Sequence, residues 1–86
     1  MKAKFNITML DGNQFEVTAI VPDFIAWERQ SKKKISDLVS NIAIEDMAFL
    51  AHSALKRTGE KVKPFDGWIA EVEEIGMADE DPKATK

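Results

Sequence analysis

An alternation of apolar and polar residues over residues 4–21 constrains the fold of this chain more than any other feature. The apolar positions are Phe5, Ile7, Met9, Phe15, Val17, Ala19 and Val21. Between the two halves stands Asp11-Gly12-Asn13, a strong turn signal because Gly and Asn tolerate positive φ. The pattern predicts a β-hairpin over residues 3–21 with one apolar face. Since a lone hairpin is marginally stable in water, helices are expected to cover that face.

Two helices are predicted with defined ends. Pro22 and Asp23 favour a helix start, and a short helix is expected over about 23–31. Residues 44–58 carry one broad apolar face, with acidic residues in the first turn and basic residues in the last. Gly59 is placed to end this second helix as a C′ glycine. Between the two helices, residues 35–43 are interpreted as either a helical turn or a packed loop.

A third helix is predicted over about 65–75, where apolar residues recur at helical spacing. Its stripe consists of Phe65, Trp68, Ile69, Val72 and Ile75. Residues 77–86 have no apolar period and include Asp79-Glu80-Asp81-Pro82, which is typical of a disordered acidic tail. With 86 residues, the chain is long enough for one domain and not two. The sequence therefore predicts a single α+β domain over residues 1–76, a hairpin packed against about three helices.

Composition narrows the class of function. The chain has no cysteine and a net charge of −3, so thiolate metal sites are excluded and a broad basic face for nucleic acid is not expected. Its apolar runs are too short to span a bilayer, and the N-terminus lacks the continuous apolar core of a signal peptide. The expected location is the cytoplasm, with no membrane partner.

No residue pattern indicates catalysis, a cofactor or a metal. His52 is the only histidine, and Ser53 is merely its neighbour in sequence, so the pair does not form a catalytic relay. We interpret His52 as a surface or boundary residue. The C-terminal carboxylates lack the spacing of a calcium loop, and the four glycines are too dispersed to cradle a phosphate.

Phe49 breaks the pattern of the helix at 44–58, because it falls opposite the apolar face, among Glu45, His52, Ser53 and Lys56. One explanation is that the helix is central and that Phe49 packs under the hairpin or under residues 35–43. The other is that Phe49 anchors a partner, with His52, Ser53 and Lys56 at the rim of the contact. The two tryptophans, Trp27 and Trp68, are most simply core residues, although either could reach an interface with one edge. These six residues are the predicted protein-binding set.

Several segments together resemble a known family. They are Val21-Pro22-Asp23-Phe24-Ile25-Ala26-Trp27-Glu28-Arg29, Ile44-Glu45-Asp46-Met47-Ala48-Phe49-Leu50-Ala51, Ala54-Leu55-Lys56-Arg57-Thr58-Gly59 and Pro64-Phe65-Asp66-Gly67-Trp68-Ile69-Ala70-Glu71-Val72-Glu73-Glu74-Ile75. With the N-terminal hairpin, they look like the tail assembly chaperones of long, flexible-tailed (siphovirus) bacteriophages. The resemblance covers residues 4–76. One position departs from it, since related sequences often place an aromatic residue where this chain has His52.

The resemblance implies a non-enzymatic helper in the cytoplasm of the infected host cell. Such a protein binds the tape measure protein, keeps it soluble, helps to recruit tail tube subunits, and is absent from the finished virion. The family often makes a second, longer product by ribosomal frameshifting. Self-association is a further expectation. The alternatives are a small nucleic-acid-associated regulator, with Lys32–Lys34, Lys56, Arg57, Lys61 and Lys63 as a basic edge, and a structural tail or head-completion protein.

Overall fold

Three antiparallel strands and three helices form an α+β fold in the computed structural model, which describes residues 2–34 and 42–78. The elements in chain order are β1 (Lys2–Met9), β2 (Gln14–Ile20), α1 (Val21–Ser31), α3 (Ile44–Arg57), α4 (Phe65–Ile69) and β3 (Val72–Met77). The predicted fold class is thereby confirmed. Most of the ambiguous segment 35–43 lies outside the described residues, and residues 42–43 lead into α3 without helical structure.

The N-terminal hairpin forms, but it ends at Ile20 and not at the predicted residue 21, because Val21 begins α1 and is exposed. β1 and β2 pair antiparallel, with Phe5 opposite Val17 and Ile7 opposite Phe15. At the turn, Gly12 has a φ of 95°, the left-handed conformation that glycine adopts without strain. Alternation is preserved, so the odd-numbered side chains of both strands pack in or against the core, while the even-numbered ones, Ile20 included, lie on the other face.

The predicted helix over 65–75 is wrong beyond Ile69. α4 ends there, and the chain turns into β3, which pairs antiparallel with β1 on the side away from β2. A bulge explains why this strand looks helical in sequence. Ile75 pairs with Ile7 and Val72 pairs with Met9, so one extra residue separates them and both pack against the core at a spacing of three. Met77 belongs to β3 and not to the predicted tail, and residues 79–86 lie outside the described part.

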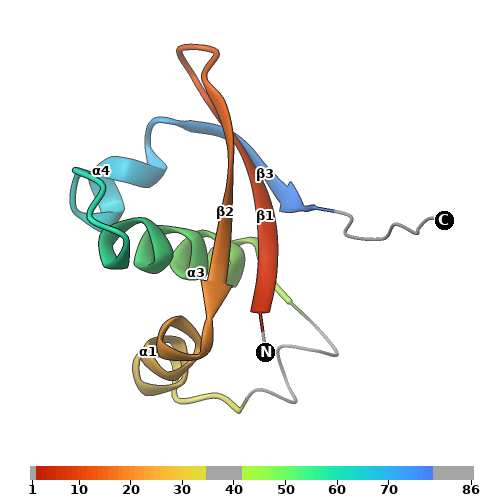
Figure 1. The fold of residues 1–86 in the computed structure, drawn as a ribbon, viewed down its shortest axis with the longest axis vertical. Coiled ribbons are helices and arrows are strands. Elements are labelled where there is room, and N and C mark those ends of the chain that lie inside the picture. Colours follow the sequence, from red (N-terminus) through yellow and green to blue (C-terminus); the bar gives the residue numbers. More distant parts are fainter. Residues whose placement is uncertain (1, 35–41, 79–86) are drawn as a thin grey trace, which may run out of the picture.

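The helices lie on the apolar face of the sheet. α3 crosses that face and contacts β2 and β3, while α1 and α4 pack against α3 at different places along it (Figure 1). The core is built mainly from Phe5 and Ile7 of β1, Trp27 of α1, Leu50 of α3 and Trp68 of α4. α3 is therefore central, and it is covered on more sides than a helix lying at the surface.

α1 begins two residues before the predicted start, and Asp23 organises its first turn. One carboxylate oxygen of Asp23 accepts a hydrogen bond from the Ile20 backbone N–H at 2.9 Å, which caps the helix. The other accepts from the Ser53 hydroxyl at 2.7 Å, and Arg57 of α3 forms an ion pair with the same carboxylate at 3.1 Å. Because Asp23 is only 1% exposed, its charge is held almost entirely by these partners.

Asp46 plays the matching part in α3. One of its oxygens accepts from the Ala43 backbone N–H at 3.1 Å, and the other accepts from the Trp27 indole N–H at 2.9 Å. Asp23 of α1 thus binds α3, and Asp46 of α3 binds α1. This reciprocal arrangement fixes the two helices against each other through buried, directional bonds.

Candidate protein-binding surfaces

A groove opens between α1 and α3, and Phe49 lies in it. The groove has a volume of about 250 Å³, and Phe65 of α4 also lines it. The rings of Phe49 and Phe65 lie with their centroids 6.2 Å apart, and both side chains are half-buried. Lys33 and Glu45 stand at its edges. We call this the Phe49 groove; it has an aromatic floor and a charged rim.

His52 is buried, although the sequence placed it at the surface or boundary. It is 7% exposed, and its Nε2–H donates to the Lys63 carbonyl at 2.7 Å. Its ring lies 5.5 Å from that of Phe65 and 5.3 Å from that of Trp68, measured between centroids. The reason is α4, which packs over the side of α3 that carries His52. A helical wheel cannot show that a later segment folds back onto its polar side.

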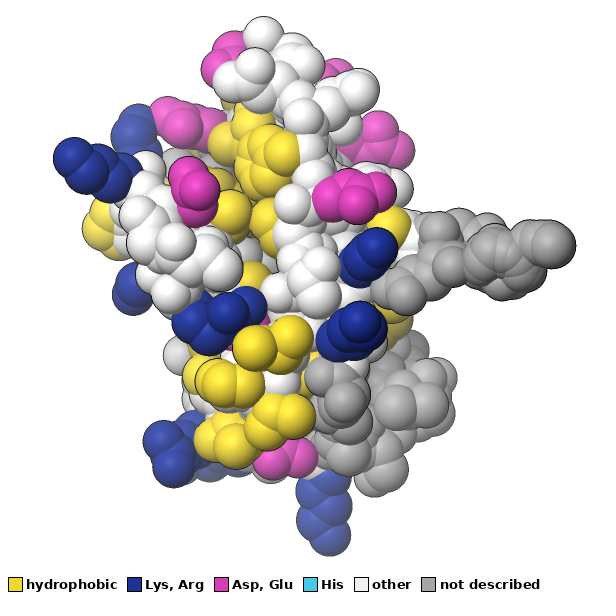
Figure 2. Space-filling view, in the orientation of Figure 1, with side chains coloured by type: hydrophobic (Ala, Val, Ile, Leu, Met, Phe, Trp, Pro, Cys, Tyr) yellow, Lys and Arg dark blue, Asp and Glu magenta, His cyan; other side chains and the backbone are white. Residues whose placement is uncertain are grey.

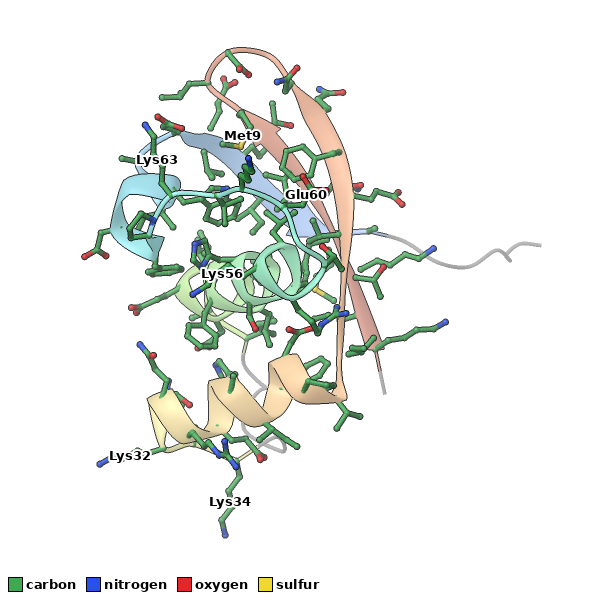
Figure 3. All side chains as sticks on the ribbon, turned by 60° about the vertical axis from the view of Figure 1, so that its left-hand side comes forward. Met9, Lys32, Lys34, Lys56, Glu60 and Lys63 are labelled. Carbon is green, nitrogen blue, oxygen red and sulfur yellow. The ribbon has the colours of Figure 1, made fainter. Side chains whose placement is uncertain are left out.

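The other predicted residues are distributed between the interior and the surface. Trp27 and Trp68 are 1% and 3% exposed, so both contribute to the core. Ser53 is partly buried and is hydrogen-bonded to Asp23. Lys56 is exposed on α3, as Figure 3 shows. Of the six residues, Lys56 is therefore exposed, Phe49 and Ser53 are partly buried, and the other three are buried.

A larger cleft, which was not predicted from the sequence, lies beneath the turn of the hairpin. It has a volume of about 580 Å³ and lies between β2, the end of α3 and the segment 58–63. Its apolar lining consists of Met9, Phe15, Val17, Ala54, Leu55, Val62 and Trp68. Figure 2 shows apolar side chains exposed below the turn, with charged side chains around them. One signal could have indicated it, because Val62 is an apolar residue inside an otherwise charged linker.

Charged residues surround this hairpin cleft. Figure 3 shows Glu60 and Lys63 on either side of the opening, with Met9 above it. Lys63 forms an ion pair with Glu71, so these two charges offset each other. Asp11, Glu16, Glu60 and Lys61 supply the remaining charge, which is net acidic.

The basic edge of the nucleic-acid alternative is not a continuous row of free cations. Arg57 is bound to Asp23, and Lys63 is bound to Glu71. In Figure 3, Lys32 and Lys34 lie at the end of α1, well separated from Lys63 near α4. A phosphate backbone would need these cations at regular spacing along one surface.

An apolar patch is exposed at the start of α1. Val21 and Ile25, one helical turn apart, are 48% and 43% exposed, and Pro22 is exposed between them. Apolar side chains gather at this place in the lower part of Figure 2. The patch is separate from both hollows, since none of its three residues lines either of them.

Within residues 2–34 and 42–78, no three His, Cys, Asp or Glu side chains come close enough together to hold a metal ion. No helix in that part of the chain has both the length and the apolar character needed to cross a membrane. Comparison with known proteins gives no match to a family model, to a curated protein or to a solved structure.

Proposed function

We propose that this chain is a non-enzymatic protein-binding domain. More specifically, we propose that it is a siphovirus tail assembly chaperone, which binds the tape measure protein in the host cytoplasm, keeps it soluble and helps to recruit tail tube subunits. The sequence resemblance over residues 4–76 supports the specific role. The geometry of the surface supports the general one.

The observation that carries the proposal is the half-buried Phe49 in its groove. An apolar client helix placed between α1 and α3 would bury the exposed edges of Phe49 and Phe65. Lys33 and Glu45 would remain in contact with solvent at the edge of the groove. Hydrophobic grooves bind amphipathic helices through a few apolar anchors, and in the Phe49 groove Phe49 and Phe65 would be the apolar contacts among polar lining residues such as Gln30 and Ser31. Aromatic anchors at the centre of an interface commonly supply most of its binding free energy.

Co-expression with the tape measure protein of the same phage tests the proposal. The native chain should raise the soluble fraction of the client. Phe49→Ser should remove most of that effect, at a cost in folding stability of about 2–4 kcal/mol, because the side chain is only half-buried. Leu10→Ser is the matched control: Leu10 is 64% exposed on the hairpin turn and lies outside both hollows, so its loss should leave client solubility unchanged.

Gln30→Trp keeps the test decisive if Phe49→Ser fails to fold. Gln30 is exposed and lines the Phe49 groove, so a Trp there would fill the groove from its polar side without touching the core. A folded Gln30→Trp protein that solubilises the client as well as the native chain would contradict this binding mode. Recovery of the chain in purified virions would instead favour the structural tail or head-completion role.

A further inference from the structure

β2 has an open outer edge beside the hairpin cleft. In the sheet order β2-β1-β3, β2 has a neighbour on one side only. Two backbone groups on the open side of β2 are already bonded to side chains of the helices. The Thr18 carbonyl accepts from Arg57 of α3, and the Ile20 N–H donates to Asp23 of α1. The Met9 N–H donates to the Asn13 carbonyl across the turn, which makes residues 9 and 13 a hydrogen-bonded pair. In the register of the hairpin, the backbone N–H and C=O groups of the odd-numbered residues of β2 therefore point toward β1, and those of the even-numbered residues point outward.

Two residues of that edge keep their backbone groups available. Among the described residues, no hydrogen bond occupies the outward N–H or C=O of Gln14 or Glu16. Arg57 marks the end of the available stretch, because it takes the Thr18 carbonyl. Backbone donors and acceptors in such a row are a template for a further strand.

The hairpin cleft lies where the side chains of such a strand would project. Phe15 and Val17 face the helices and line the cleft, while Glu16 between them lies on the polar face of the sheet. A strand added at this edge would turn every second side chain into the cleft, against Leu55 and Val62. Main-chain bonds would supply affinity, and the cleft would supply selectivity.

We propose that the β2 edge binds an extended segment of a partner protein that carries a Lys or Arg between two apolar residues. The apolar residues would enter the hairpin cleft, and the cation would lie opposite Glu16. The net acidic rim of the cleft, which includes Asp11 and Glu60, also favours a positively charged partner segment. This surface shares no lining residue with the Phe49 groove, so the inference goes beyond the proposed function.

Charge argues against the two occupants that the chain itself could supply. A second copy pairing antiparallel through its own Gln14–Thr18 edge would bring Glu16 opposite Glu16, and like charges opposite each other destabilise a strand pair. The segment 79–86 begins with Asp79-Glu80-Asp81, which the acidic rim of the cleft repels. The residues beside its Lys83 are Pro82, which has no N–H for a strand pair, and Ala84, which is too small to fill the cleft.

The test is an NMR titration of the full chain with the capped synthetic peptide Thr-Thr-Val-Lys-Val-Thr-Thr. Binding should shift the amide signals of Gln14 and Glu16 and slow the hydrogen exchange of both. The same peptide with Glu in place of Lys should bind about threefold more weakly, which is the usual size of a cross-strand charge effect. The Glu16→Lys variant should instead bind the Glu peptide more tightly than the Lys peptide. This reversal would show that the central residue of the peptide lies opposite residue 16.

Glu16→Pro is the variant that blocks the edge. An outward-facing N–H can be lost from an edge strand without loss of the fold, and the proline removes the central donor of the edge. Binding should fall at least tenfold, with Glu16→Thr as the control that keeps the N–H. Peptide shifts confined to other residues, no binding at millimolar peptide, or dimerisation through β2 would each overturn the proposal. The peptide titration does not involve the tape measure protein. A negative titration would therefore not contradict the proposed chaperone function, and a negative co-expression test would not contradict peptide binding at the β2 edge.

Discussion

Asp23 and Asp46 are two buried carboxylates at equivalent positions in α1 and α3. Each uses one oxygen to cap its own helix and the other to hold the opposite helix. The sequence shows Asp23 as a helix-start residue, which is the local half of its role. The contact with Ser53 joins residues 30 positions apart, and only the packed helices reveal it.

Arg57→Ala should lower the free energy of unfolding by about 2–3 kcal/mol. The substitution leaves the Asp23 charge buried with fewer partners, and the loss is reduced because the Arg57 side chain is itself 31% exposed. Urea unfolding measures the change, and Lys56→Ala on the adjacent exposed position should cost less than about 0.5 kcal/mol. Equal effects of the two substitutions would show that the ion pair adds nothing to stability.

At the scale of elements, the hairpin and two of the helices could be predicted because their signals are local. Alternation, the Asp11-Gly12-Asn13 turn and the Gly59 terminus each act within a few residues. β3 could not be predicted, because the bulge opposite Thr8 and Met9 gives its inward residues a helical spacing. The hairpin cleft was missed for a related reason, since it is assembled from β2, α3 and the segment after α3.

Two glycines make the strand assignment testable. Gly76 lies in β3 with open space around the position of a Cβ, and its φ is not positive, so Gly76→Thr should stabilise the chain by about 0.5–1 kcal/mol. Gly59 has a φ of 90°, so Gly59→Thr should destabilise it by about 1 kcal/mol or more. Thermal melts of both variants give the signs, and a lower midpoint for Gly76→Thr would argue against a strand at this position.

For the whole molecule, the pairing of β1 with β3 is the longest-range connection in the sheet. It brings Phe5 opposite Met77, and the Ala78 N–H bonds the Lys4 carbonyl. It also places Val72 and Ile75 against the core. Integrity of the domain therefore depends on contacts between the two ends of the described chain.

Stopping the chain after Glu71 should abolish cooperative unfolding, because it exposes one edge of β1 and removes Val72 and Ile75 from the core. Stopping it after Ala78 should change stability by less than about 1 kcal/mol, since all of β3 is retained. Circular dichroism during denaturation separates the two cases. A cooperative transition in the shorter protein would mean that β3 is dispensable for folding.

The position of β1 in the middle of the sheet also has a consequence for synthesis. Of the three strands, the ribosome makes β1 first and β3 last. One edge of β1, the central strand, therefore stays unpaired while the helices are being synthesised. Only when residue 77 has left the ribosome can the sheet close. A nascent chain halted before that point would carry both β2 and β1 as open edges, and premature pairing between neighbouring nascent chains would compete with folding.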